Sequence, residues 1–504
     1  MIKQSLWRAK SLPTLPDRPI PDEVDVVVVG AGITGLTAAY LLKRSGMRVA
    51  VFDREKIGSG ETGNTSAHLT CMTDERITSL EKKFGADGAR LAWDAGARAI
   101  DLIESNASEG GIDCGFRRVP AFLCAPFFDD ENLREESDAI HSDAALAARL
   151  GFPVAFTDNG PLTGRPALSI ADQAIFQPLE YVAGLALAID GDGSVVRERC
   201  EVGAEVQDPL AVVVDGRNIA CANLVIATNV PIVGIRNLAG ATLFQTKLYP
   251  YSTYIVGARL PAGSIAPGLY DDTTDPYYYL RVHEDRDGLY AVFGGEDHKT
   301  GQATDTEGCY ARLEEALRRL LPEAKIERRW SGQVVETDDG LPFIGEVAEH
   351  QYVATGYAGN GMTFGTVAGM MIHDAINGER NPWRDLFDPG RKASTTSALR
   401  RLVEENVDYP LHYIADRLRQ NTSAGIENVP RGEGRVVVVG DQRAAVHRRD
   451  DGSVVKVSAV CTHMGCLVRW NKAERTWDCP CHGSRFTPEG LVLGGPAESP
   501  LEPL

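Results

Sequence analysis

The sequence has no apolar run long enough to cross a membrane. The apolar stretch Val24–Val29, for example, ends at Gly30 and is far shorter than the roughly 20 residues that a spanning helix needs. The first 23 residues contain several prolines and lack the apolar segment of about 7–15 residues that is typical of a secretory signal. We therefore expect a cytoplasmic protein without a membrane span.

Positive charge is scarce. The chain has 52 Lys and Arg residues against 70 Asp and Glu residues, which gives a formal net charge of −18. A protein that binds nucleic acid neutralises phosphates with clustered Lys and Arg. This charge balance argues against a nucleic-acid partner, and it disfavours anionic membrane surfaces for the same reason.

Internal repeats and low-complexity tracts are also absent. The hydrophobic content of 43% and the charged content of 24% are ordinary for a soluble globular protein. A chain of 504 residues is too long for one small core, and at about 150 residues per domain it predicts roughly three units.

Cysteine is infrequent over most of the chain. Six of the ten cysteines show no motif spacing, and we expect them to be buried small hydrophobic residues in a reducing cytosol: Cys71, Cys114, Cys124, Cys200, Cys221 and Cys309. The other four lie together with two histidines in CTHMGC and CPCHGS, within residues 461–484. That density indicates a metal site.

A dinucleotide motif is present near the N-terminus. Gly30, Gly32 and Gly35 form a GxGxxG between a predicted buried strand, Val24–Val29, and a predicted helix over residues 33–43. Glycines there permit a tight turn and a close approach to a pyrophosphate at the helix N-terminus. Asp53 follows at the end of the next predicted strand, where its carboxylate can accept hydrogen bonds from ribose hydroxyls. The motif leaves the choice between FAD and NAD open.

Three further segments resemble the superfamily of FAD-dependent amine and amino-acid oxidases, which includes glycine oxidase and sarcosine oxidase. These segments are GSGETGNTSAH at 58–68, LVIATN at 224–229, and DGLPFIG at 339–345 with ATGYAGNGMTFG at 354–365. The resemblance implies FAD as the cofactor. It also implies contacts with FAD from Arg54, Thr65, Val202, Gly359, Asn360, Gly361 and Met362, in addition to the glycines and Asp53.

The sequence departs from this superfamily at two functional positions. Some relatives attach FAD covalently through a Cys or a His, and the matching positions here hold Val334 and Asn64, so we expect non-covalent FAD. Relatives that oxidise amino acids often place a carboxylate-binding Arg near Val334; its absence disfavours a simple α-amino acid. Arg281 could bind a carboxylate instead, and His68 could guide a proton or a substrate. A purely structural role is the alternative for each.

The C-terminal motif offers six ligand candidates on two loops. Residue types alone leave zinc or an iron–sulfur cluster open. The spacing C-x-H-x-G-C and C-P-C-H-G-S resembles the Rieske [2Fe–2S] signature of the type found in cytochrome bc complexes. The resemblance implies the following assignment: Cys461 and Cys479 bind one iron, His463 and His482 bind the other, and Cys466 and Cys481 form a disulfide. Phe486 stands where that type usually has a Tyr, which predicts a lower reduction potential.

The expected architecture is an α/β, Rossmann-like FAD-binding domain with an inserted α+β substrate domain, followed by a small all-β Rieske domain. We assign the FAD-binding domain to residues 20–115, 176–245 and 331–380, and the substrate domain to 116–175 and 246–330. A helical connector is predicted over 381–425 and the Rieske domain over 426–504.

The two sites together predict an FAD-dependent oxidoreductase. We expect it to oxidise a C–N bond of a small amine or amino-acid-like substrate and to pass electrons singly from the flavin to the cluster. An unidentified electron carrier protein would exchange electrons with the chain. Two alternatives remain: a flavin oxidase that uses O₂ and carries a structural or redox-sensing Rieske domain, and a non-catalytic electron-transfer flavoprotein.

Overall fold

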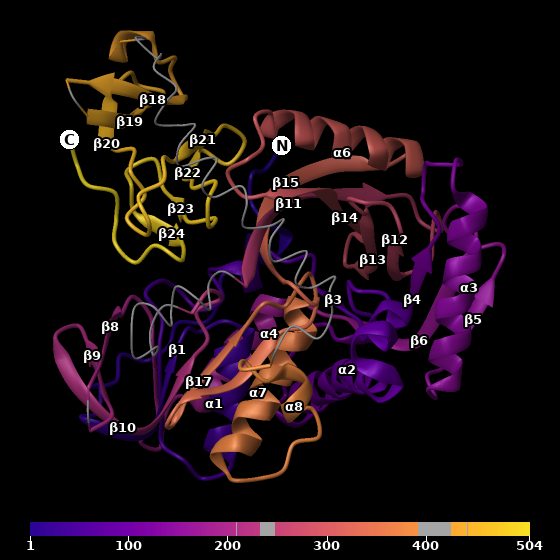
Figure 1. Ribbon diagram of the computed structural model, residues 1–504, viewed down its shortest axis with the longest axis horizontal. Coiled ribbons are helices and arrows are strands. Elements are labelled where there is room, and N and C mark those ends of the chain that lie inside the picture. Colours follow the sequence, from indigo (N-terminus) through magenta and orange to yellow (C-terminus); the bar gives the residue numbers. More distant parts are fainter. Residues whose placement is uncertain (208, 232–246, 392–424, 441) are drawn as a thin grey trace.

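The computed structural model describes residues 1–207, 209–231, 247–391, 425–440 and 442–504 (Figure 1). The first of its sheets has eight strands in the order β16-β17-β10-β1-β2-β7, and β9 and β8 extend it beside β10. Their bounds are β1 Glu23–Val29, β2 Val49–Phe52, β7 Val195–Arg197, β8 Val202–Gln207, β9 Ala211–Val214, β10 Arg217–Ile226, β16 Phe343–Ala348 and β17 Gln351–Thr355.

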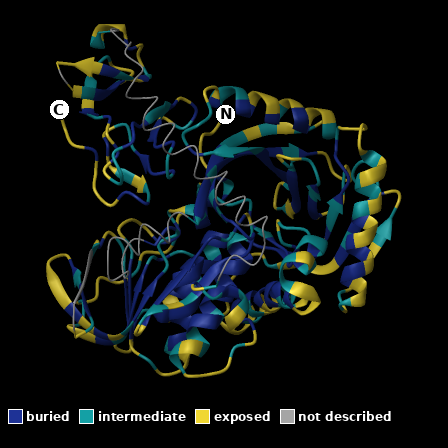
Figure 2. Cartoon of the chain, in the orientation of Figure 1, coloured by how far each residue is buried: buried dark blue, intermediate teal, exposed yellow. Residues whose placement is uncertain are grey.

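Both faces of this sheet are covered, as the valine-rich β1 predicts. Val26 and Val28 pack in the same core cluster as the helices α1 (Ile33–Arg44), α4 (Pro178–Ile189) and α7 (Gly361–Ile376), whereas Val27 packs with the β8–β9 strands on the other side. Figure 2 shows the central strands and these helices largely buried. β1 pairs in parallel with β2 and β10, which gives the predicted Rossmann-like arrangement.

The stretch AVVVDGRNIACA predicts a hairpin with its turn at Asp215 and Gly216, and the structure has this hairpin before β10. Asp215 and Gly216 have φ of 47° and 79° and join the antiparallel strands β9 and β10. Positive φ at both turn residues is what a two-residue hairpin turn requires.

A second, nine-stranded sheet lies above the first (Figure 1). Its order is β15-β11-β14-β13-β12-β4-β6-β3, and β5 pairs with β6. The bounds are β3 His68–Leu69, β4 Arg117–Cys124, β5 Val154–Thr157, β6 Ala167–Ile175, β11 Leu248–Leu260, β12 Gly268–Asp272, β13 Tyr279–Asp285, β14 Gly288–Lys299 and β15 Lys325–Thr337. The helices α2 (Ile77–Glu109), α3 (Leu133–Arg149) and α6 (Thr306–Leu320) accompany it.

The sequence predicts short aromatic-rich strands around Tyr249–Tyr254 and Tyr277–Gly294, but β11, in the first of these stretches, is 13 residues long. β11 pairs with β14 on one side and with β15 on the other over most of its length, with a register shift between Ser252 and Tyr254. Pairing on both sides supports a long strand through a local irregularity. β15 therefore continues across the predicted domain boundary between residues 330 and 331.

Within residues 425–440 and 442–504, the regular elements of the C-terminal unit are strands and one short 3-10 turn, η3 (Ile426–Asn428). A three-stranded sheet contains β18 (Gly434–Val439), β19 (Gln442–Arg448) and β20 (Val454–Ser458). A four-stranded sheet contains β21 (Arg469–Asn471), β22 (Thr476–Asp478), β23 (Arg485–Phe486) and β24 (Val492–Gly494). The fully buried Trp477 and Phe486 lie in its core.

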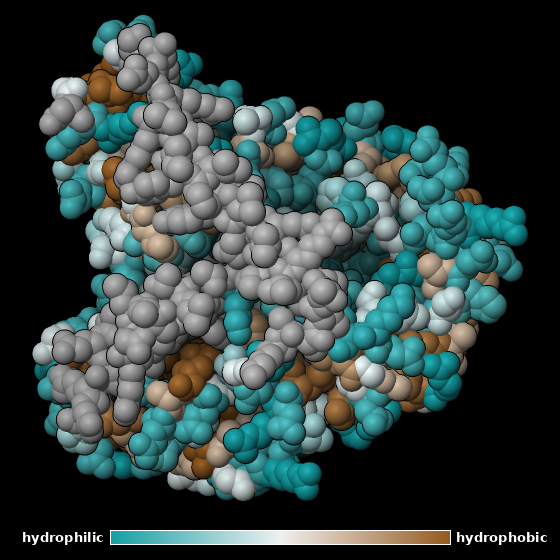
Figure 3. Space-filling model, viewed as in Figure 1, coloured by the Kyte–Doolittle hydropathy of each residue, from teal (hydrophilic) through white to brown (hydrophobic). Residues whose placement is uncertain are grey.

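The remaining elements are short: η1 (Leu6–Ala9), η2 (Glu61–Gly63) and α8 (Arg384–Phe387). Residues 392–424 of the predicted connector lie outside the described residues. Within the described part of the chain, every helix is too short or too polar to span a bilayer. On the face drawn in Figure 3, hydrophilic side chains predominate and apolar ones are scattered among them.

Candidate functional site

A cavity of about 1010 Å³ lies between the two large sheets. Its wall also includes residues of the C-terminal unit, among them Thr487, Val492, Leu493 and Gly494. Binding cavities for drug-sized ligands measure about 300–1,000 Å³, so this one has room for a dinucleotide with a small substrate beside it. We call the part near the GxGxxG the nucleotide end and the part formed by the nine-stranded sheet the acidic end.

The glycines of the motif build the nucleotide end by close backbone contact. Gly30 has φ of 107°, and a Cβ atom on it would lie 2.4 Å from the carbonyl oxygen of Ala227. A Cβ atom on Gly35 would lie 2.0 Å from the carbonyl oxygen of Gly30, so Gly35 permits the close packing of α1 and does not line the cavity. Gly30 and Gly32 line it directly. This backbone fits the predicted dinucleotide.

Asp53, which directly follows strand β2, holds the GxGxxG turn in place. Its carboxylate accepts hydrogen bonds from the backbone N–H groups of Ala31, at 2.7 Å, and Glu55, at 2.8 Å. Burial raises its pKa, and these two donors oppose that rise. Arg54 and Val202 line the cavity beside it, and the Arg54 guanidinium donates to the Leu493 carbonyl oxygen of the C-terminal unit at 3.1 Å.

The residues that the flavin resemblance implies also line this cavity: Thr65, Gly359, Asn360, Gly361 and Met362. Asn360 is held in place by the loop before α2, because its side chain accepts from the Asp74 backbone N–H at 3.0 Å and donates to the Met72 carbonyl at 2.9 Å. Helix α7 begins at Gly361. The tertiary structure thus brings these residues together with the GxGxxG.

The two candidate catalytic residues lie in different places. His68 lines the cavity; its Nδ1 is 2.9 Å from the Ser66 hydroxyl, and its Nε2 is 3.5 Å from an Asp271 carboxylate oxygen. Burial, with the Arg281 charge as a second cause, lowers its pKa to about 3. Arg281 is 2% exposed, donates to the Ala67 carbonyl at 2.8 Å and lies over the Trp7 ring. It is not among the residues that line the cavity.

Sequence reasoning missed the acidic end. Besides Asp272, its wall contains three carboxylic acids and two tyrosines beside His68: Asp74, Asp271, Asp297, Tyr277 and Tyr279. Burial is the main cause that raises the pKa of Asp271 and of Asp297 to about 7 each. A usable signal existed, since an Asp within an otherwise apolar strand pattern is rarely buried without a role.

The two cysteine–histidine loops have the same backbone form. The N–H of Cys461 donates to the Cys466 carbonyl at 2.8 Å, and that of Cys479 donates to the Ser484 carbonyl at 2.8 Å. Gly465 and Gly483 have φ of 76° and 69°, a conformation in which glycine has no steric cost. The glycines of the motif thus have a local structural reason.

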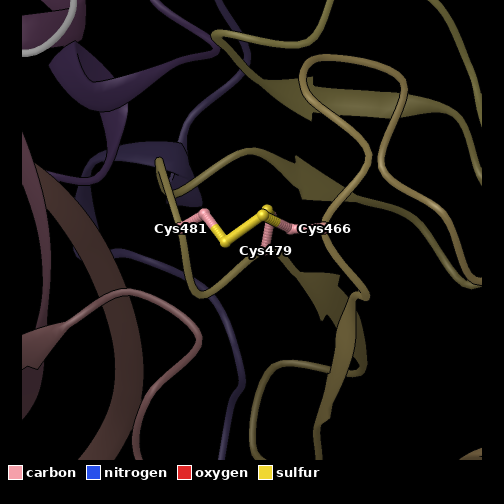
Figure 4. Close-up of side chains that lie close together, drawn as sticks. All are labelled: Cys466, Cys479 and Cys481. Atoms are coloured by element: carbon pink, nitrogen blue, oxygen red, sulfur yellow. A yellow bond between two sulfur atoms is a disulfide. The ribbon is translucent and has the colours of Figure 1, made fainter. Parts of the chain in front are cut away.

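A disulfide joins Cys466 to Cys481, as the resemblance implied, and Figure 4 shows the Cys479 side chain beside it. The sulfur atoms of these three cysteines lie within 4.8 Å of one another. Cys466 and Cys481 form the disulfide, so their sulfurs are not thiolates, and only thiolates are strong metal ligands. A ligand set must therefore come from Cys479 and the remaining side chains of the loops.

Those remaining side chains fit a mixed cluster. A hydrogen bond from Cys479 lowers the pKa of Cys461 to about 7, and the pKa of Cys479 is raised by the same contact. The rings of His463 and His482 have centroids 4.9 Å apart, and burial lowers the pKa of each to about 4. Two adjacent sulfurs and two adjacent neutral imidazoles are the donors that a Rieske centre requires. Phe486 is buried and has no hydroxyl to donate to a cluster sulfur. The lower reduction potential expected from this stays a prediction.

One cluster loop packs against the edge of the nine-stranded sheet. The Gln333 side chain, from β15, donates to the Gly483 carbonyl at 2.9 Å and to the Thr300 hydroxyl at 3.1 Å. Gln302 donates to the Pro480 carbonyl at 3.1 Å. Gly301 fits so closely that a Cβ atom there would lie 2.8 Å from the Pro480 nitrogen.

Comparison with known proteins covers both parts of the chain. The model of the FAD dependent oxidoreductase family (DAO) matches residues 25–375, and the model of the Rieske [2Fe-2S] domain matches residues 422–504. YhfW of Bacillus subtilis (strain 168), described as a Rieske 2Fe-2S iron-sulfur protein, is 31% identical over 507 residues, which is 99% of this chain and 97% of that protein.

Two further proteins match the first part alone. Gamma-glutamylputrescine oxidoreductase of Escherichia coli (strain K12) is 26% identical over 366 residues, 70% of this chain and 84% of its own length. The crystal structure of glycine oxidase from Geobacillus kaustophilus superposes with a TM-score of 0.59 at 20% identity, covering 75% of this chain and 99% of that one. The glycine oxidase therefore shares the fold of the two large sheets.

Proposed function

Because this chain belongs to the FAD dependent oxidoreductase family and carries a Rieske [2Fe-2S] domain, we propose that it is an amine dehydrogenase whose flavin delivers electrons to its own cluster. The family establishes an FAD-dependent oxidoreductase. The substrate type, the route of the electrons and a cytoplasmic location are our proposal. The location is supported by the six scattered cysteines, all of which are free and buried.

The proposed reaction balances as a two-electron oxidation. With FAD bound as the hydride acceptor, the substrate would lose a hydride from carbon and a proton from nitrogen, so that the C–N bond would become C=N, and water would hydrolyse the imine to a carbonyl compound and an amine. FAD supplies two-electron acceptance with one-electron release, and a [2Fe–2S] cluster carries one electron at a time. An external one-electron carrier protein takes the electrons onward. The chain positions the substrate and excludes water.

FAD is proposed to be held without a covalent bond by the nucleotide end and by Gly359–Met362. Val334 and Asn64, which stand where some relatives have an attached residue, both line the cavity and have no nucleophilic side chain. The cluster is proposed to be held by Cys461, Cys479, His463 and His482, whose geometry suits it.

One observation carries the proposal of internal electron transfer. Gln333 contacts the cluster loop through Gly483, which follows the ligand His482, and its chain neighbour Val334 lines the cavity. Gln333 is 5% exposed, and its backbone N–H donates to the Glu61 carboxylate at 2.7 Å, so the contact is anchored at both ends. A cluster that is only structural would not need its ligand loop against the wall of the flavin cavity.

Anaerobic stopped-flow with a panel of amines and N-methyl amines tests this function. Flavin bleaching followed by the electron paramagnetic resonance signal of a reduced Rieske cluster is expected. Gln333→Leu should slow cluster reduction at least ~tenfold, leave flavin bleaching unchanged, and increase hydrogen exchange at residues 479–483. Gln442→Leu, at an exposed position of β19, is the matched control. Reoxidation of the flavin by O₂ faster than by the cluster would identify an oxidase instead.

A further inference from the structure

The acidic end of the cavity has a charge that its own protein groups do not balance. Among the described residues that line the cavity, three carry a permanent positive charge, and each has a partner. Arg8 donates to the Ser59 carbonyl, Arg54 donates to the Leu493 carbonyl, and Arg76 pairs with Asp143 and Glu136. His68, the cavity histidine, stays neutral because burial holds its pKa near 3. Among the described residues, none of these three arginines forms an ion pair with Asp74, Asp271 or Asp297.

Besides Asp272, three carboxylic acids line this end of the cavity: Asp74, Asp271 and Asp297. Asp74 lies in the loop before α2, Asp271 at the end of β12, and Asp297 in β14. Asp297 and Asp271 both raise the pKa of Asp74, which places the three within electrostatic reach of one another. The side chain of Asp74 is exposed, and it lines the cavity.

Asp272 shows what a structural carboxylate looks like in the same wall. It accepts hydrogen bonds from the Phe127 and Tyr278 backbone N–H groups, at 3.0 and 2.8 Å, and from the Thr274 hydroxyl at 2.8 Å. Asp297 has a side-chain hydrogen bond with Thr253, but one of its buried carboxylate oxygens has no hydrogen-bond partner among the described residues. An unpaired buried oxygen is costly, which indicates that a ligand donor completes it.

Aromatic faces surround the acids. The rings of Tyr277 and Tyr279 have centroids 5.9 Å apart, and Tyr279 makes an edge contact with His68 at 5.7 Å. Such rings attract cations through their faces. Acids and aromatic rings together suit an ammonium group and repel a carboxylate, and Arg281, the candidate carboxylate partner, is buried outside the cavity.

We propose that the substrate is an amine that carries a second cationic nitrogen and no carboxylate, such as a diamine, and that Asp74, Asp271 and Asp297 select it. This inference rests on the proposed oxidation of a C–N bond. It excludes the carboxylate-bearing amino acids as preferred substrates, because their negative charge would enter a site without an available cation.

Three probes with the same four-carbon chain test this selection in the FAD-loaded full-length protein: 1,4-diaminobutane, pentylamine and 5-aminopentanoate. They differ only in the distal group, which is ammonium, methyl or carboxylate. Anaerobic stopped-flow mixing gives each apparent Kd from the concentration dependence of the change in the visible spectrum of the flavin, followed before and during bleaching. We expect 1,4-diaminobutane to bind at least ~tenfold more tightly than pentylamine, and 5-aminopentanoate to bind most weakly.

Asp74→Asn and Asp297→Asn are the variants, each replacing a carboxyl group that can ionise beside a bound ammonium with a neutral amide of similar shape. Each should reduce the preference for the diamine over pentylamine about tenfold while pentylamine binding stays the same. Glu284→Gln is the control, since Glu284 is exposed in β13 and outside the cavity. Unchanged pentylamine binding shows that a variant is folded and keeps its flavin.

The selection is overturned if 5-aminopentanoate binds as tightly as the diamine, if no diamine binding is measurable, or if both variants keep the full preference. Diamine binding without flavin bleaching also overturns it, because a substrate must be oxidised. Bleaching by the diamine without a reduced-cluster signal has a different meaning: the substrate inference stands, and the proposed electron route fails.

Discussion

The two ends of the cavity use carboxylates in opposite ways. At the nucleotide end, Asp53 accepts two backbone N–H groups and holds a glycine turn in place. At the acidic end, Asp297 has a buried oxygen without such a donor. Burial raises the pKa of both groups, so burial alone does not distinguish them. The difference in partners does: satisfied carboxylates support the backbone, and unsatisfied ones are available to a ligand.

The largest effect is expected from a substitution that disrupts the nucleotide end itself. Gly30→Ala adds a Cβ atom 2.4 Å from the Ala227 carbonyl oxygen at φ of 107°, so we expect a loss of ~3 kcal/mol or more in stability and loss of bound flavin. Gly46→Ala is the matched control, because Gly46 has φ of 92° with open space around it and should cost only ~1 kcal/mol. Thermal unfolding and the flavin absorbance of the purified proteins measure both. Full flavin content in Gly30→Ala would contradict the assignment.

Asp53→Asn should have the next largest effect. The substituted amide places a donor against one of the two backbone N–H groups that the carboxylate now accepts. We expect the variant to be less stable by ~2 kcal/mol and to bind FAD at least ~tenfold more weakly. Urea unfolding and flavin release on dilution measure these changes. A variant as stable as the parent would show that Asp53 does not support the glycine turn.

Binding of 1,4-diaminobutane should weaken as the pH falls, because the carboxylates of the acidic end then become protonated. Burial raises the pKa of Asp271 and of Asp297 to about 7; the charged groups that add to this rise are Asp272, Glu336 and Glu296, and a hydrogen bond with Thr253 opposes it at Asp297. Both protonate as the pH falls from 8 to 6, so we expect the Kd to rise about tenfold, whereas the Kd of pentylamine should change less. A Kd that falls with pH would place the cation elsewhere.

The smallest expected effect has the opposite sign to that of Asp53→Asn. The folded-state pKa of Asp297 lies above its ordinary value, so without ligand this carboxyl destabilises the fold as the pH rises from about 4 to about 7. Asp297→Asn should therefore stabilise the ligand-free protein by ~1 kcal/mol at pH 8, after allowance for solvent screening, and have no such effect near pH 4. Urea unfolding at the two pH values measures it. An equal change in stability at both pH values would show that the cause is not electrostatic.

Much of the fold could be predicted because its signals are local. The strand before the GxGxxG, the helix after it and the Asp215–Gly216 turn each depend on neighbouring residues, and the structure has all three. Long strands such as β11 were predicted too short, because their length depends on partners distant in the sequence.

The candidate site divides in the same way. The sequence by itself determined the two cofactors and the disulfide through family resemblance, because the motifs that carry the resemblance are compact, although residue types alone left FAD or NAD and zinc or an iron–sulfur cluster open. Only the tertiary structure decided that Arg281 is packed against Trp7 while His68 lines the cavity, and that Asp74, Asp271 and Asp297 meet. These acids come from three separate segments, and no local pattern fixes which buried charges will face one another across a cavity.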